Sequence, residues 1–389
     1  MLGTGTLALG QLIAGCGRPS QVTLRVQVLN GSIPAQLVNE FRHSLNQPVE
    51  LNFAPVEQLK DLFTQLESWK KQQTAKVDDN RSLFHLPWIK SKPSLVTDLV
   101  TLGDYWLAPA ISQGLIQPLD HPSQLLRWST LPSRWQQLVR RDRLGYLDPQ
   151  GEVWAAPYSW GTTVIVYNRD KFESLGWTPR DWSDLWREEV RDRISLLDQP
   201  REVIGLTLKK LGKSYNTENL EQVSGLELEM RALNRQVKFY SSDTYLQPLL
   251  LGDTWLAVGW STDVLPVIQR YRQIAAVIPQ SGTALWANLW VRPAGAAYSN
   301  SLGKQWIDFC WEQQIAQQIS LLSKATSPIA VTLNPADIQR ELRNLLLLEP
   351  QILQRSEFLQ PLSATTLKQY ESLWKAVRHF PGIDQKGTI

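Results

Sequence analysis

The chain has 389 residues, of which 43% are hydrophobic and 20% are charged, a composition typical of a soluble globular protein of about two domains. Its formal net charge is only +3, and basic and acidic residues are interspersed, which argues against nucleic-acid binding. Beyond Cys16 no apolar run approaches 18 residues, so no transmembrane helix is predicted.

The first residues have the pattern of a bacterial lipoprotein signal. Residues 1–14 are mostly apolar or small and uncharged, and the sequence LIAGC ends at Cys16. The segment is shorter than the roughly 20 apolar residues that span a bilayer, so we predict a cleaved signal over residues 1–16 with lipidation of Cys16. The alternative is a chance cysteine after a short apolar segment. No Lys or Arg precedes the apolar run, so we expect the true start to lie upstream of Met1.

Strands and helices are predicted to alternate along the chain. The strands are short runs of apolar, β-branched or aromatic residues, at Val22–Val28, Glu50–Phe53, Asp98–Val100, Thr162–Tyr167, Val237–Tyr240 and Leu256–Trp260. The helices are predicted at Pro34–Phe41, Gln58–Trp69, Trp182–Trp186, Arg201–Leu211, Leu220–Leu233, Gly303–Leu322, Asn334–Leu347 and Ala364–Val377. Strands separated by helices indicate parallel βαβ units and hence an α/β protein.

Catalytic and metal-binding motifs are not found. None of the four His has a partner at metal-ligand spacing, and no nucleophile elbow is present. Gly212-Lys213-Ser214 is similar to the end of a phosphate-binding loop, but Thr207 stands where that loop needs a glycine, so Gly212 is interpreted as a helix C-cap. Cys310 is expected to be a buried free thiol in a helix. We therefore predict no enzyme activity, no metal and no cofactor.

The sequence of one segment is more informative than the secondary structure that it predicts. The sequence PYSWGTT at residues 157–163 is followed by a strand that ends in YNRDKF at residues 167–172. This segment resembles the crossover strand of the extracellular solute-binding proteins of ABC importers, in the spermidine/putrescine-binding branch. Further motifs of that branch match at Asp98–Val100, Gly114–Leu119, Trp182–Trp186, Asp198–Val203, Leu208–Gly212, Gly252-Asp253, Pro279 and Trp286–Asn288. The resemblance covers roughly residues 24–389, and residues 66–94 are interpreted as extra material.

The resemblance implies a two-lobed type II periplasmic-binding-protein fold. Each lobe would be a mostly parallel sheet flanked by helices, and two crossover strands would join the lobes. Lobe one would hold residues 23–162 and 287–330. Lobe two would hold residues 163–286 and 331–389. The ligand of such proteins lies between the lobes, where domain interfaces generally favour binding sites.

The resemblance also implies where a ligand would bind. The aromatic and polar positions that the polyamine binders use fall here on Tyr105, Glu202, Trp260, Trp286 and Gln360. Two of that branch's acidic positions are occupied instead by Gln199 and Asn288. Some of its aromatic positions are not retained, and Trp160 or Trp106 could substitute for them. Each position also has a purely structural interpretation. The two indoles could be core, Glu202 could be a solvated or salt-bridged helix residue, for example paired with Arg201, and Tyr105 could serve packing only.

A cleft with one carboxylate is a poor host for a dication or trication, because a buried cation needs nearby anions. We therefore expect a small solute with less positive charge, carrying an amine or several hydroxyl groups. The predicted function is a lipid-anchored, monomeric, extracytoplasmic protein, in the periplasm or at the cell surface. Its predicted partners are this solute and the permease subunits of an ABC importer. The alternative is a non-transport surface lipoprotein or an enzyme on the same scaffold.

Overall fold

The computed structural model describes residues 22–79, 95–119, 124–296, 301–323, 325–329 and 333–378. Its strands are β1 (Val22–Leu29), β2 (Val49–Val56), β3 (Leu99–Gly103), β4 (Ile116–Gln117), β5 (Arg140–Arg141), β6 (Glu152–Val153), β7 (Ala155–Asn168), β8 (Ile194–Leu196), β9 (Val237–Tyr240), β10 (Leu256–Trp260), β11 (Ile274–Val277), β12 (Ala284–Pro293) and β13 (Glu357–Phe358). Its α-helices are α1 (Ala35–Ser44), α2 (Leu59–Asp79), α3 (Leu107–Ser112), α4 (Ser133–Val139), α5 (Arg169–Leu175), α6 (Pro200–Lys210), α7 (Leu226–Asn234), α8 (Gln247–Leu251), α9 (Ser261–Arg270), α10 (Ser301–Cys310), α11 (Gln313–Leu322), α12 (Arg343–Leu346), α13 (Pro350–Arg355) and α14 (Ala364–Arg378).

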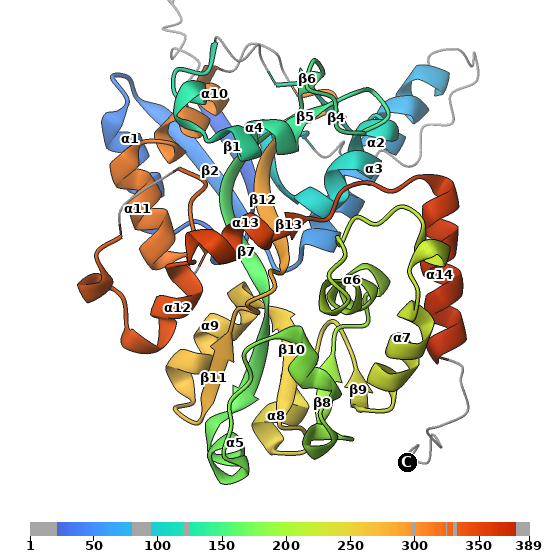
Figure 1. Cartoon of the computed structure of the whole chain (residues 1–389). Coiled ribbons are helices and arrows are strands. Elements are labelled where there is room, and N and C mark those ends of the chain that lie inside the picture. Colours follow the sequence, from blue (N-terminus) through green and yellow to red (C-terminus); the bar gives the residue numbers. More distant parts are fainter. Residues whose placement is uncertain are drawn as a thin grey trace, which may run out of the picture.

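Two strands run through both halves of the molecule. The main sheet has the order β2-β1-β3-β12-β7-β10-β8-β9, and β7 lies at its centre (Figure 1). Residues 155–162 of β7 pair with β12, whereas residues 163–168 pair with β10 and β11. On either side the strands β1, β2 and β3 are parallel, as are β8, β9 and β10. The predicted α/β architecture of two lobes joined by crossover strands is confirmed.

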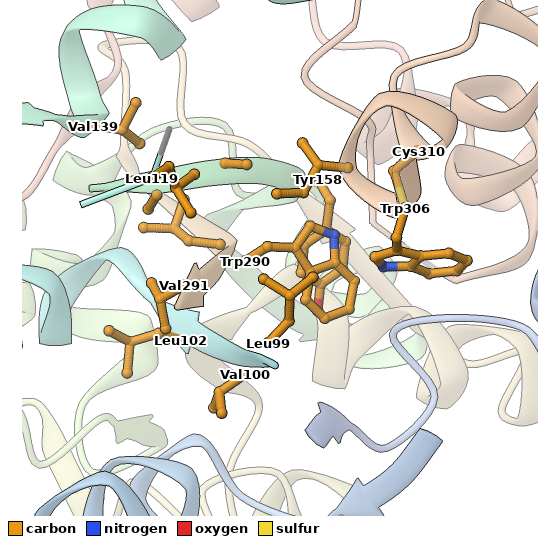
Figure 2. Packing of buried hydrophobic residues seen from close by; sticks show 14 of the residues in the cluster. Leu99, Val100, Leu102, Leu119, Val139, Tyr158, Trp290, Val291, Trp306 and Cys310 are labelled. Atoms are coloured by element: carbon orange, nitrogen blue, oxygen red, sulfur yellow. The ribbon is translucent and has the colours of Figure 1, made fainter. Parts of the chain in front are cut away.

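The first lobe has a core rich in tryptophan. Trp290 of β12 stacks on Tyr158 of β7, with ring centroids 4.2 Å apart, and meets the edge of Trp306 from α10 (Figure 2). Cys310 lies in the same cluster as a buried free thiol, as predicted. Burial raises the pKa of Cys310 well above its usual range, so the thiol is not a reactive nucleophile. We call this cluster the first-lobe core.

The sheet of the second lobe is covered on both faces. Ile165 contributes to a cluster with α6, α7 and α14, whereas its neighbours Val164 and Val166 contribute to a cluster with α8 and α9. Adjacent residues of a strand point to opposite faces, so one β-branched run serves both clusters. We call these clusters the α6-side core and the α9-side core. This double burial explains why residues 162–167 contain no charged residue.

The C-terminal segment, residues 333–378, packs on both lobes. It crosses the molecule from α12 through α13 to α14 (Figure 1). Leu345 belongs to the α9-side core, Phe358 to the first-lobe core and Tyr370 to the α6-side core. In addition, β13 pairs with β12 at Ala284 and Leu285. The lobe boundaries predicted from the sequence remain a prediction, because this segment contacts all three cores.

Several predicted helices are shorter or broken. The helix expected over residues 220–233 is interrupted, since a 3-10 turn ends at Gln222 and α7 starts only after its N-cap Gly225, whose φ is 79°. The helix expected over residues 303–322 is wrong as one element, since Glu312 is extended and separates α10 from α11. Residues 334–347 form two short 3-10 turns followed by the short helix α12, and Trp182–Trp186 is a 3-10 helix. The predicted segments are thus helical in part, but as shorter elements than the sequence suggests.

Other features agree with or extend the predictions. Gly212 ends α6 with a φ of 70°, and Lys213 N–H donates to Leu208 O at 2.8 Å, which confirms the C-cap. Helix α2 continues to Asp79, so the stretch interpreted as extra material begins as a helix. Among the described helices, none is long and apolar enough to cross a bilayer.

Candidate functional site

A buried carboxylate lies where the chain crosses between the lobes. Glu202 is in the first turn of α6, which Pro200 opens at its first position. Both carboxylate oxygens accept from Thr163 Oγ1 at 3.1 Å, and Oε1 accepts from Trp260 Nε1 at 3.2 Å. Burial raises the pKa of Glu202, while these two donors and the charge of Arg201 oppose that rise. The carboxylate is thus held in place by neutral donors.

Trp286 packs against the strand beside this carboxylate. Its Nε1 donates to Thr162 O at 3.4 Å, and a Cβ added at Gly161 would lie 2.2 Å from its Cζ2. The glycine is therefore needed for the indole to approach β7 so closely. Ser261 Oγ accepts from Thr162 N at 3.1 Å and lies beside the same glycine. Both Trp260 and Trp286 are half-buried, so each keeps part of its surface free.

Two further predicted positions lie on β7 and β12. Asn288 is buried, and its Nδ2 donates to Ser159 Oγ at 3.1 Å. It is two residues from Trp286 and so points to the same face of β12. Trp160 is the neighbour of Ser159 in β7 and points to the other face, where its Nε1 donates to Ser327 O at 3.0 Å. Its ring packs on Trp135, so Trp160 has the contacts of a core residue.

The remaining predicted positions meet around Arg201. Tyr105 is 54% exposed, and its ring meets Trp106 edge-on with ring centroids 5.4 Å apart. Arg201 Nη1 donates to Gln360 O at 3.1 Å, and its Nη2 donates to Asn216 Oδ1 at 3.0 Å. Gln199 precedes α6 in an extended conformation and makes no side-chain cap hydrogen bond.

Arg201 itself was not predicted as a site residue. It is buried, its guanidinium lies 5.2 Å from the ring centroid of Tyr370, and burial lowers its pKa. Among the described residues it forms no ion pair with Glu202, which excludes the salt-bridge interpretation of that carboxylate there. Because Arg201 and Glu202 are adjacent in sequence, the sequence suggests a salt bridge between them. In the structure Arg201 instead bonds Gln360 and Asn216, whereas Glu202 accepts from Thr163.

A pocket of about 220 Å³ opens next to Gln360. Its lining includes Arg134 and Arg141 from α4 and β5, Asn216, and the backbone segment from Ser356 to Gln360. The α4 residue Leu138 belongs to the first-lobe core, whereas Tyr215, which precedes Asn216, belongs to the α6-side core. The pocket therefore lies between the lobes. In the part of the chain that the structure describes, no group of three or more acidic, His or Cys residues could hold a metal ion.

Comparison with known proteins identifies the family. The sequence profile of the bacterial extracellular solute-binding proteins matches residues 94–345. The chain belongs to this family. Within it, the chain is similar to the spermidine/putrescine-binding periplasmic protein of Escherichia coli, at 28% identity over 223 residues, which is 57% of this chain and 61% of that protein. The chain thus matches about three fifths of the length of that relative. The putrescine/cadaverine-binding protein of Pseudomonas aeruginosa is 26% identical over 255 residues, covering 62% of this chain and 71% of that protein.

Solved structures of this family share the fold. The spermidine/putrescine substrate-binding protein of Streptococcus pneumoniae superimposes with a TM-score of 0.73 at 17% identity, covering 92% of this chain and 99% of that one. A lipoprotein of Treponema pallidum superimposes with a TM-score of 0.65 at 20% identity, covering 91% and 99%. The type II two-lobed fold and the resemblance to the polyamine-binding branch are therefore confirmed. The ligand positions are not tested by these comparisons.

Proposed function

We propose that this solute-binding protein captures a small polar solute between its lobes and delivers it to the permease of an ABC importer. The observation that carries the proposal is the cluster of Glu202, Trp260 and Trp286 around residues 161–163, where β7 passes from one lobe to the other. A carboxylate flanked by two half-buried indoles suits a cation or a group of donors on a solute with an apolar part. No bond is made or broken in this function.

The proposed solute carries less positive charge than a polyamine. Glu202 is the only acid at the family's ligand positions here, and Gln199 and Asn288 contribute no charge. Asn288 already bonds Ser159, which occupies one of its amide donors. One carboxylate offsets one ammonium group, so the preferred solute has a single amine or several hydroxyl groups.

Capture would proceed by closure about β7 and β12. The strands of the two lobes meet within β7 at residues 161–163 and beside Trp286 of β12, so the proposed hinge lies where β7 changes its pairing partner. The contacts of Trp286 with Gly161 and of Glu202 with Thr163 lie at this crossing. Solute bound there would contact both sides of the hinge and favour the closed form.

The proposed location is outside the cytoplasm, with the N-terminus held at a membrane by a lipid on Cys16. Cys16 lies outside the described residues, and the proposal rests on the LIAGC sequence. A diacylglyceryl thioether supplies more than one acyl chain, which stable anchoring requires. Cys16→Ser should move the protein to the soluble extracytoplasmic fraction. Retention of the variant in membranes as firmly as the parent would exclude lipidation at Cys16 as the anchor.

The test begins with mass spectrometry of the solute that co-purifies with the protein, followed by calorimetric titration of that solute. A hydrogen bond to a charged group contributes about 1.5 to 3 kcal/mol, so Glu202→Gln should weaken binding roughly tenfold to a hundredfold. Trp286→Ala should weaken binding at least as much. Glu221→Gln, at an exposed position, is the matched control for the lost carboxylate. Unchanged affinity in both site variants, with intact melting temperatures, would contradict the proposed site.

A further inference from the structure

The pocket between the lobes is lined by two guanidinium groups, of which Arg141 also interacts at longer range with the charges of Asp104 and Asp142. Within the described residues, neither Arg134 nor Arg141 forms an ion pair. Burial lowers the pKa of both, to about 10 for Arg141, because each cation is partly removed from water. The pocket's own carboxylate, Glu357, is neutralised by Lys209, whose Nζ lies 2.8 Å away. The pocket thus carries net positive charge.

Both guanidinium groups are held in place and keep free donors. Arg134 Nη1 donates to Leu353 O at 2.9 Å. Arg141 Nε donates to Leu138 O at 2.8 Å, and its Nη1 donates to Gly145 O at 3.2 Å. In the described part of the chain the Nη2 atom of neither side chain has a hydrogen-bond partner. Backbone carbonyls therefore orient both groups, while donors remain for a ligand.

A third guanidinium positions the opposite wall. Arg201 bonds the backbone carbonyl of Gln360 and the side chain of Asn216, and both of these residues line the pocket. Glu202, the carboxylate of the proposed amine site, is the next residue in α6. Arg201, which supports this wall, and Glu202 of the amine site are therefore consecutive residues in the first turn of α6.

We propose that this pocket binds the carboxylate end of the solute, so that the protein takes an ω-amino carboxylate or a similar zwitterion. This inference rests on the proposed function. Arginine is suited to carboxylates, because its planar donors match the two oxygens. The pocket volume of about 220 Å³ is below the roughly 300–1,000 Å³ of complete ligand sites, as expected for one end of a solute. A diamine would place its second ammonium group among cations and be rejected.

The test compares three ligand classes on protein freed of co-purified solute. A series of ω-amino carboxylates of increasing chain length is titrated by calorimetry beside the diamine and the monocarboxylate of each length. We expect at least one amino carboxylate to bind at least tenfold more tightly than its matched diamine and its matched monocarboxylate. Arg134→Gln should weaken that binding at least tenfold, and Arg134→Lys should lose less. Arg143→Gln, in the exposed connection between β5 and β6, is the control and should not change it.

The outcomes separate this inference from the proposed function. Binding that depends on Glu202 but is unchanged in Arg134→Gln, or that favours the diamine, overturns the inference and leaves the proposed function standing. A monocarboxylate that binds as tightly as the amino carboxylate shows a separate anion site and also overturns the inference. Binding that depends on neither residue overturns both. Absence of binding by the whole series overturns the inference, while the co-purified solute still tests the proposed function. Melting temperatures of each variant report whether it is folded.

Discussion

Asp104 is a buried carboxyl group whose ionisation opposes folding. It lies in the turn after β3, and its Oδ1 accepts from Ala287 N, next to Trp286, at 2.9 Å. Burial raises its pKa from the ordinary 3.8 to about 7, against the opposing effects of the Ala287 N–H and the charge of Arg141. A raised carboxyl pKa means that the protonated form is favoured in the folded state. The protein should therefore lose stability as the pH rises from about 4 to about 7.

The size of this effect follows from the two pKa values. A rise from 3.8 to about 7 corresponds to about 4 kcal/mol when the group is fully ionised, as at pH 8. At pH 5 the cost is about 2 kcal/mol, because only part of it has developed. Asp104→Asn removes the charge and keeps an acceptor for Ala287. The free energy of unfolding of this variant, relative to the parent, should thus rise by about 2.5 kcal/mol between pH 5 and pH 8.

Urea denaturation of both proteins at the two pH values measures this difference. Asp243→Asn, at an exposed turn, removes the same charge from the surface and serves as the control. A smaller stability of Asp104→Asn than of the parent at pH 8 would refute the reasoning. It would mean that the Asp104 carboxylate is stabilised in the folded protein by its donors and by Arg141, so that its pKa is not raised. A stability difference between Asp104→Asn and the parent that does not change with pH would also refute the reasoning.

Two more changes test the site directly. Gly161→Ala would place a Cβ 2.2 Å from Trp286, so calorimetry should show weaker solute binding, and denaturation should show a loss of about 1–3 kcal/mol in the free energy of unfolding. Gly303→Ala is the control and should be neutral, because its Cβ would meet only atoms at 3.7 Å or more. Equal effects of the two substitutions would contradict this explanation. The double variant Gln199→Asp/Asn288→Asp should gain spermidine binding that the parent lacks or shows only weakly, and tight spermidine binding by the parent would show that those two acids are dispensable.

The elements that the sequence predicts well are those with a strong local signal. The β-branched run from Thr162 to Tyr167 identifies a strand buried on both faces, and the structure extends it to residues 155–168. The cluster of Glu202, Trp260 and Trp286 was predicted from motifs, and these side chains do come together. The contact with Thr163 is what holds the carboxylate, and it was not foreseen.

The features that were missed depend on contacts between distant parts of the chain. Arg134 meets the carbonyl of Leu353, 219 residues away, and no local pattern indicates such a pairing. No glycine or proline marks the break at Glu312 between α10 and α11. Both helices pack on the first-lobe core, and we attribute the break to this packing. The burial of Asp104 likewise follows from its contact with Ala287, 183 residues on. Propensity reports on neighbours in sequence, and these residues are placed by neighbours in space.

The C-terminal segment has a consequence for how the protein is made. Leu345, Phe358 and Tyr370 each complete a different core, and all three leave the ribosome after strands β1 to β12 have been synthesised. Until then the nascent chain exposes apolar surface in each lobe, the condition in which large proteins aggregate. Completion of the cores requires contacts across more than a hundred residues, such as Asn216 Nδ2 with Phe358 O, 142 residues apart, and such contacts form slowly. Truncations within the last helix should therefore lower yield more than they lower the affinity of the molecules that do fold.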